Sequence, residues 1–178
     1  MSKIYKLRFD VDQYENINPV EKKDADYYQS FDGSPKLQTW RTMKVERMEP
    51  ALGRELGDAP GFNIPVLRKR ALDCLLPFIL DDVEVLPLEL EGEILYAINV
   101  TTVLDAIDYS RSKYVTFKDG KRILAFKKYA FRKEEIGDKN IFKIKDEPRR
   151  NPFVSEKFYS VVEKNNLKGF ALELVDEI

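Results

Sequence analysis

The sequence predicts an α+β fold with a mostly antiparallel sheet of about seven or eight short strands and two main helices. Three observations support this prediction. Short apolar or alternating runs recur along the chain, most of them are joined by hairpin turns, and only two longer segments follow the helical period. With 178 residues, of which 43% are hydrophobic, the chain is predicted to form a single domain over residues 1–178.

The first part of the chain contains two predicted strands and two irregular stretches. Residues 4–9 and 43–48 alternate between apolar and polar side chains, which is typical of half-buried strands. Between them, we assign no element to the polar, acidic stretch 10–36, which ends in a turn sequence. Residues 50–65 contain three glycines and three prolines and are predicted to form a long loop.

Two segments have the spacing of amphipathic helices. In the first, Pro65 suits the first position of a helix, residues 66–76 follow the helical period, and we predict that Pro77 ends the helix. We predict that Ser155 caps the N-terminus of the second helix, with Glu156 in the first turn. Gly169 follows that helix and precedes a closing strand.

Two hairpins are expected in the middle of the chain. The apolar runs 83–90 and 94–100 flank Glu91-Gly92-Glu93, and a second pair of runs flanks Asp119-Gly120. Residues 103–107 are predicted to add a short helical turn, and residues 141–144 a further short strand.

The composition argues against catalysis. The chain has no histidine and one cysteine, so the commonest general base and the usual ligands of a structural zinc ion are missing. No phosphate-binding glycine loop or nucleophile elbow is present. We therefore predict that the protein is not an enzyme and binds no cofactor and no metal. A metal-dependent enzyme built on Asp105 and Asp108, which would share a face of the predicted helical turn, stays open as a lesser hypothesis.

Charge is unevenly distributed along the sequence. Residues 1–110 carry a net charge of −7, residues 111–150 carry +8 and residues 151–178 carry −2. The basic segment interleaves lysines and arginines with aromatic residues, as nucleic-acid-binding modules do, so residues 111–150 form the alternative functional hypothesis. An overall pI of about 5.8 argues against it.

The location expected from the sequence is the cytoplasm. The N-terminus lacks the apolar core of a secretory signal, no stretch approaches the length of a membrane span, and one cysteine allows no internal disulfide.

Several segments together resemble a family of bacterial immunity proteins encoded beside polymorphic, contact-dependent toxins. The most specific are the Leu-Pro-Leu-Glu to Asn-Val-Thr segment (residues 86–101), its extension over residues 103–108, and the ending over residues 154–170. The resemblance covers residues 3–175. It implies a cytosolic antitoxin that binds a cognate toxin protein and blocks its active site or substrate channel.

Many antibacterial toxins act on nucleic acid through a basic cleft, so an acidic surface on the inhibitor could imitate a phosphate backbone. We therefore expect acidic side chains and one aromatic anchor to contact the toxin, which could be a nuclease. The predicted contact residues are Asp81, Asp82, Glu84, Asp105, Asp108 and Tyr109.

Overall fold

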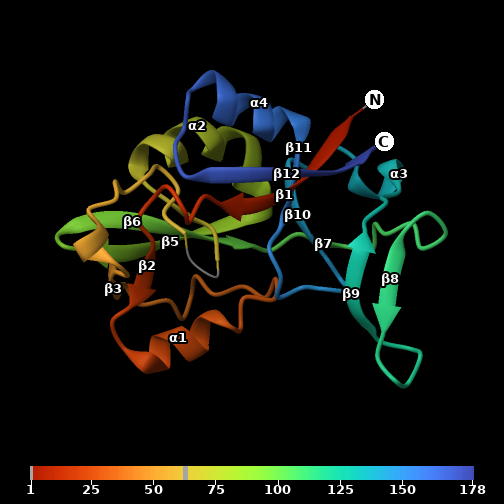
Figure 1. Cartoon of the computed structure of the whole chain (residues 1–178), viewed down its shortest axis with the longest axis horizontal. Coiled ribbons are helices and arrows are strands. Elements are labelled where there is room, and N and C mark those ends of the chain that lie inside the picture. The colour runs from red at the N-terminus through yellow and green to blue at the C-terminus, as the bar shows by residue number, and fades with distance from the viewer. Residues whose placement is uncertain (1, 62–63) are drawn as a thin grey trace.

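A computed structural model describes residues 2–61 and 64–178 (Figure 1). Within these residues the chain forms four α-helices and twelve strands, so the predicted α+β class is confirmed. The expected number of strands was too low. Most strand pairs are antiparallel, as predicted, but they belong to three separate sheets, and two of these are mixed because β3 runs parallel to β5 and β7 runs parallel to β10.

The first five-stranded sheet joins the two ends of the chain. In spatial order its strands are β12 (Phe170–Glu177), β1 (Lys3–Phe9), β11 (Phe153–Ser155), β10 (Ile141–Ile144) and β7 (Val103–Leu104). The predicted strand at residues 4–9 is confirmed as β1, which pairs with β12 along its whole length. Ser2 and Ile178 also exchange two backbone hydrogen bonds, so the described ends of the chain lie together (Figure 1).

The second five-stranded sheet is built around a long hairpin. Its strands, in order, are β2 (Ile17–Pro19), β3 (Met43–Arg47), β5 (Val83–Leu90), β6 (Glu93–Val100) and β4 (Val66–Leu67). The hairpin predicted around Glu91-Gly92 is confirmed as β5–β6. Both turn residues have positive φ angles, 49° and 86°, as the tight turns that suit twisted hairpins require.

The β5–β6 hairpin is covered on both faces, which explains its nearly continuous apolar sequence. Helices α2 (Lys69–Ile79) and α4 (Glu156–Lys164) pack above it and above β1 (Figure 1), where Leu75, Ile98 and Phe158 share one core. Helix α1 (Lys22–Tyr28) lies on the other side, where Tyr28 and Leu88 belong to a second core.

The helix predicted over residues 66–76 is only partly right. Residues 66 and 67 form β4 and pair with β6, so α2 begins at Lys69, and Pro77 lies inside the helix instead of ending it. Pro77 is on the exposed side, while Ile79 is buried together with Leu75. Burial of this last turn therefore outweighs the missing backbone hydrogen bond at the proline.

Two further differences concern short elements. The helical turn predicted over residues 103–107 is wrong: residues 103 and 104 form β7, and Ile107 makes an isolated antiparallel bridge to Phe131. The stretch 10–36, to which we assigned no element, contains β2 and α1. Both elements are short and depend on contacts with distant parts of the chain.

The second predicted helix is confirmed as α4. Its N-cap Ser155 accepts a hydrogen bond from the backbone N–H of Phe158 at 3.2 Å, and Glu156 occupies the first turn. Below it, a third core of closely packed aromatic rings, in which Tyr129 and Phe131 meet Phe153 edge to face, ties β11 to the segment before α3 (Lys133–Ile136). In the described ranges, no helix combines the length and apolar character that crossing a bilayer requires.

Candidate interaction surface

Asp81 and Asp82 lie at the junction between α2 and β5, in a 3₁₀ turn over Leu80–Asp82. Asp81 is exposed, whereas Asp82 is 5% exposed. The Asp82 carboxylate accepts a hydrogen bond from Thr102 Oγ1 at 2.7 Å and pairs with Lys139 at 2.8 Å. The hydrogen bond to Asp82 raises the pKa of Lys139. Asp82 therefore holds together three segments of the fold.

Glu84 is also engaged inside the molecule. One of its carboxylate oxygens accepts hydrogen bonds from the backbone N–H of Lys36 at 2.7 Å and from Asn99 Nδ2 at 2.9 Å. Burial alone would raise the pKa of Glu84, but these donors outweigh it and the pKa lies below its ordinary value. Glu84 thus fastens the loop before β3 to the β5–β6 hairpin.

Asp105 and Asp108 follow β7 and are surrounded by cations. Asp105 is exposed and pairs with Lys145 and, at 3.7 Å, with Arg132. Asp108 accepts hydrogen bonds from Ser110 Oγ at 2.6 Å and Arg111 Nε at 2.7 Å, and these two partners lower its pKa. Because their partners are Lys145, Arg132 and Arg111, both carboxylates are largely neutralised locally.

Tyr109 is the one aromatic residue among the six predicted contact residues, and it is exposed. Its side chain is 41% exposed, and its hydroxyl donates a hydrogen bond to Asp146 at 2.9 Å. Burial of the hydroxyl, together with this bond, raises the pKa of Tyr109 to about 12. The ring meets Tyr114 edge to face, with the centroids 6.0 Å apart.

The six predicted residues therefore fall into two groups with different partners. Asp81, Asp82 and Glu84 belong to the α2–β5 junction. Asp82 binds Thr102 and Lys139, and Glu84 binds Lys36 and Asn99. Asp105, Asp108 and Tyr109 lie between β7 and β8, where the shared helix face assumed for the two aspartates does not exist. Across the described ranges, no group of three potential ligands could hold a metal ion, so the hypothesis of a metal-dependent enzyme gains no support.

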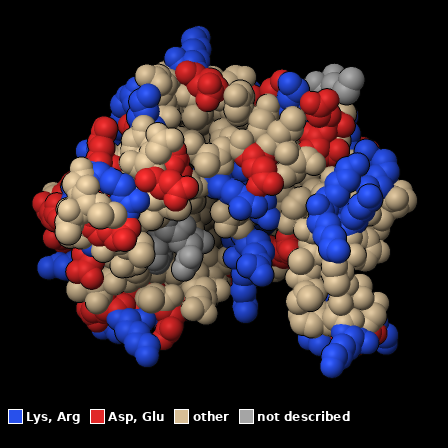
Figure 2. All heavy atoms as spheres, viewed as in Figure 1, with Lys and Arg blue, Asp and Glu red and all other residues tan. Residues whose placement is uncertain are grey.

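Residues 111–128, the first part of the basic–aromatic segment 111–150, form a projecting hairpin, which we call the arm, whereas the later residues of the segment include α3 and β10 of the body. The arm's strands β8 (Lys113–Thr116) and β9 (Ile123–Lys128) pair only with each other, and the predicted hairpin around Asp119-Gly120 is thereby confirmed. Figure 2 shows the arm standing apart from the body, with blue basic groups at both of its ends and uncharged atoms between them. Most of its side chains are exposed on both faces.

Two surface grooves run along the arm. The first, with a volume of about 510 Å³, is lined by residues that include Tyr109, Tyr114, Phe117 and Asp146. The second lies between the arm and the segment after β10, and Phe117 and Asp146 line it as well. Ile123 also lines both grooves, so the two grooves meet at these three residues.

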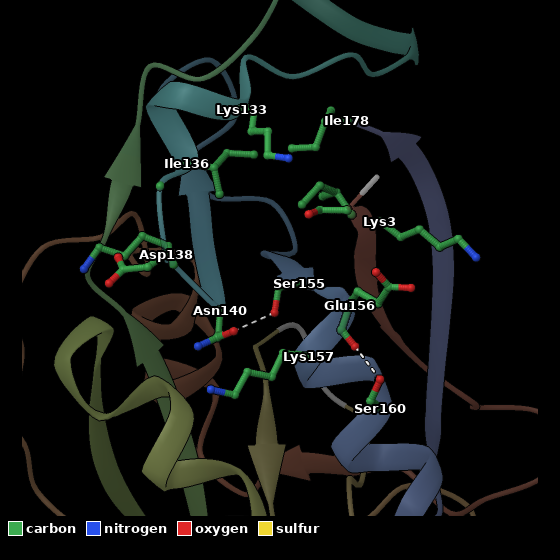
Figure 3. A pocket seen from close by; sticks show the side chains of 14 residues that line it. Lys3, Lys133, Ile136, Asp138, Asn140, Ser155, Glu156, Lys157, Ser160 and Ile178 are labelled. Atoms are coloured by element: carbon green, nitrogen blue, oxygen red, sulfur yellow. Dashed lines mark hydrogen bonds between the residues drawn. The ribbon is translucent and has the colours of Figure 1, made fainter.

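A separate pocket lies between α3, the start of α4 and the chain ends (Figure 3). Two hydroxyls of its lining are occupied by internal bonds: Ser155 Oγ donates to Asn140 Oδ1 at 2.7 Å, and Ser160 Oγ donates to the carbonyl oxygen of Glu156 at 2.9 Å. Lys139, also on its rim, pairs with Asp82. These two hydroxyls cap and brace α4.

Comparison with known families decides the class of the protein. A family model described as Immunity protein family (Imm11) matches residues 83–177, which is more than half of the chain. The chain belongs to the Imm11 immunity protein family. The predicted resemblance to immunity proteins is thereby confirmed. No curated protein matches the chain.

The matched segment of this Imm11 protein extends from β5 to β12 and contains the whole arm. Glu84, Asp105, Asp108 and Tyr109 lie within it, whereas Asp81 and Asp82 precede it. Strand β1 also lies outside the matched range, yet it is hydrogen-bonded between β11 and β12. The unmatched part therefore supplies a strand that the matched part needs for its sheet.

Two residues beside the arm of the Imm11 protein were missed by the sequence analysis. Asp146 binds Tyr109 and lines both grooves, but in sequence it is one of many acidic residues in turns. Lys143 lies in β10, where its place in a short strand gave no sign of burial. It is 4% exposed, and its ammonium donates to the carbonyl oxygens of Phe31 and Pro148. Only the close packing of neighbouring segments could have identified either residue.

Proposed function

We propose that this Imm11 protein is the antitoxin of a bacterial polymorphic toxin system, and that it neutralises a cognate toxin domain in the cytoplasm by covering its active site. The match of residues 83–177 to an immunity family carries this proposal. The composition supports it, because a chain without histidine and with one cysteine is poorly equipped for turnover. Inhibition by steric cover requires only a complementary surface.

Within the predicted contact residues, we propose that Asp81 and Tyr109 make the main toxin contacts. Asp81 is exposed and Tyr109 presents a ring that is 41% exposed. Asp105 and Asp108 contribute less in this proposal, since each already faces cations of its own chain. Asp82 and Glu84 position the surface through their bonds to other segments of the same chain. A toxin with a basic cleft, such as a nuclease, would suit the acidic members.

The toxin domain encoded by the neighbouring gene provides the direct test. Co-expression with the Imm11 protein should restore growth that the toxin alone arrests, and the two purified chains should form a complex that lacks toxin activity. Growth arrest that persists despite soluble Imm11 protein, with no complex formed, would refute the proposal.

Single substitutions test the contacts. Tyr109→Ala and Asp81→Lys should each weaken toxin binding, because they remove an aromatic contact and reverse an exposed charge. Leu52→Ala and Asp12→Lys are matched controls, since Leu52 and Asp12 are also exposed but lie far along the chain from the proposed contacts. Equal binding by all four variants would discard these two contacts and leave the antitoxin role intact.

A further inference from the structure

The arm is poorly explained as a structural element. A two-stranded hairpin is marginally stable in water unless it packs on other elements. The arm is anchored at its base, where Arg111 donates to the carbonyl oxygen of Phe131 at 2.5 Å and Ser112 bonds with Ala130. Beyond this base, its strands are paired only with each other, and Phe126 is the arm residue that packs against the aromatic core, where its ring stacks on Tyr129. A projection that contributes little to the core is available for binding.

The arm exposes an unusual amount of apolar surface. Tyr114 is 40% exposed, Phe117 42% and Leu124 49%, and Tyr109 at its base adds a third exposed ring. These side chains line or flank the two grooves that meet at Phe117. Clustered exposed apolar side chains with a polar rim are typical of protein interaction sites.

The rim of this surface is strongly basic. Residues 111–128 contain seven basic residues and one acidic residue, a net charge of +6, although the whole chain carries −1 and the rest of it therefore −7. The one acidic residue, Asp119, is paired with Arg122 at 2.7 Å. In the part of the chain that the structure describes, Lys118 and Lys121 near the tip make no ion pair, so their charges face the solvent.

We propose that the arm is the docking element for the cognate toxin domain, and that it seats on an acidic face of that domain which carries an apolar side chain into the groove between Tyr109 and Phe117. This inference rests on the proposed function and adds to it the chemistry of the partner. Opposite charges would steer the two proteins together, and the apolar centre would hold them.

Nucleic acid fits this surface less well. Leu124 and Val115 cannot stack on bases, Tyr109 and Tyr114 meet edge to face rather than forming a stacking platform, and a body with a net charge of −7 would repel a phosphate backbone. Binding of nucleic acid through the arm is therefore treated as an outcome that would overturn the proposal.

The test measures the affinity of the purified Imm11 protein for an inactivated toxin domain encoded by the neighbouring gene. The charge variant Lys118→Glu/Lys121→Glu should weaken binding by about tenfold or more and reduce its dependence on salt. Leu124→Ser should weaken binding by about fivefold at any salt concentration. Thermal unfolding should leave both variants close to wild type, because the three side chains are exposed.

Matched controls carry the same changes elsewhere. Lys22→Glu/Lys44→Glu alters net charge equally at two exposed lysines of α1 and β3, and Leu52→Ser changes a leucine that is 61% exposed. Both should bind the toxin domain as wild type does. Wild-type affinity in the arm variants would overturn the docking proposal while leaving the antitoxin role standing. No binding by wild type would instead refute the antitoxin role and the docking proposal with it.

Gel shifts with DNA and RNA at low salt complete the experiment. No shift is expected. A shift that is lost in Lys118→Glu/Lys121→Glu, while toxin binding is unaffected, would assign the arm to nucleic acid and overturn the proposal.

Discussion

Replacement of the buried Lys143 by methionine should abolish a rise in stability that the wild type shows at alkaline pH. Burial is the main cause that lowers the pKa of Lys143 from 10.5 to about 8; the nearby Asp32 opposes this effect and Lys36 adds to it. Between these two pH values the unfolded chain binds more protons at this residue than the folded protein does. The free energy of unfolding therefore rises with pH across this window.

The magnitude follows from the two pKa values. Their difference corresponds to about 3 kcal/mol, which the wild type should gain between about pH 7 and about pH 10.5 and Lys143→Met should not. At neutral pH the variant escapes the cost of burying a charge but leaves the carbonyl oxygens of Phe31 and Pro148 without this donor. The two effects oppose each other, so the two proteins should be closest in stability there.

Urea denaturation followed by the fluorescence of Trp40 measures this difference. Trp40 packs against Phe31, whose carbonyl oxygen binds Lys143, so the probe reports on the same region. Lys44→Met, at an exposed lysine of β3, should follow the wild-type curve and is the control. A stability difference between wild type and Lys143→Met that stays constant from neutral to alkaline pH would refute the reasoning.

Three further predictions concern the supporting structure. Phe153→Ala should lower the free energy of unfolding by about 3–5 kcal/mol, because Phe153 is 1% exposed and packs among aromatic rings, and an unchanged urea midpoint would contradict this. Ser155→Ala should cost about 1–2 kcal/mol by removing the α4 cap and the bond to Asn140; Ser160→Ala, at an exposed position, should cost less in the same assay. Glu84→Gln should cost about 1–3 kcal/mol at neutral pH. Because the pKa of Glu84 is lowered in the folded protein, the stability difference between wild type and Glu84→Gln should shrink as the pH falls through this pKa. Urea denaturation at a series of acidic pH values measures this difference. A difference that stays constant with pH would contradict the role of the hydrogen bonds to the carboxylate.

The parts of the fold that could be predicted are those determined by the conformational preferences and hydrogen bonds of residues close together in sequence. Glu91-Gly92 adopts the positive φ angles of a tight hairpin, Asp119-Gly120 turns the arm, and Ser155 caps α4, and each needs only its immediate neighbours. The very short strands could not be predicted in this way. Residues 66–67 and 103–104 are strands only because β6 and β10 offer them partners.

A register shift explains another limit. Strict alternation along the closing strand would place Val175 on the opposite face from Leu174 and on the same face as Glu177. The pairing of β1 with β12 shifts between Ile4 and Tyr5, which leaves Val175 as an extra residue and reverses the alternation after it. Val175 then packs on the aromatic core.

The candidate surface was predictable only in its exposed members. Tyr109 was expected to be an accessible aromatic residue, and it is. The roles of Asp82 and Glu84 depend on Lys139, Lys36 and Asn99, which are up to 57 positions away in sequence, so charge alone could not separate structural carboxylates from available ones.

The placement of β1 between β11 and β12 has a consequence for synthesis in the cell. Strand β1 can pair with its two neighbours only once β11 and β12 have been made, so its apolar side chains wait without these partners while more than 140 residues are added. A chain that stops before β11 would therefore leave both edges of β1 unpaired and could not close this sheet.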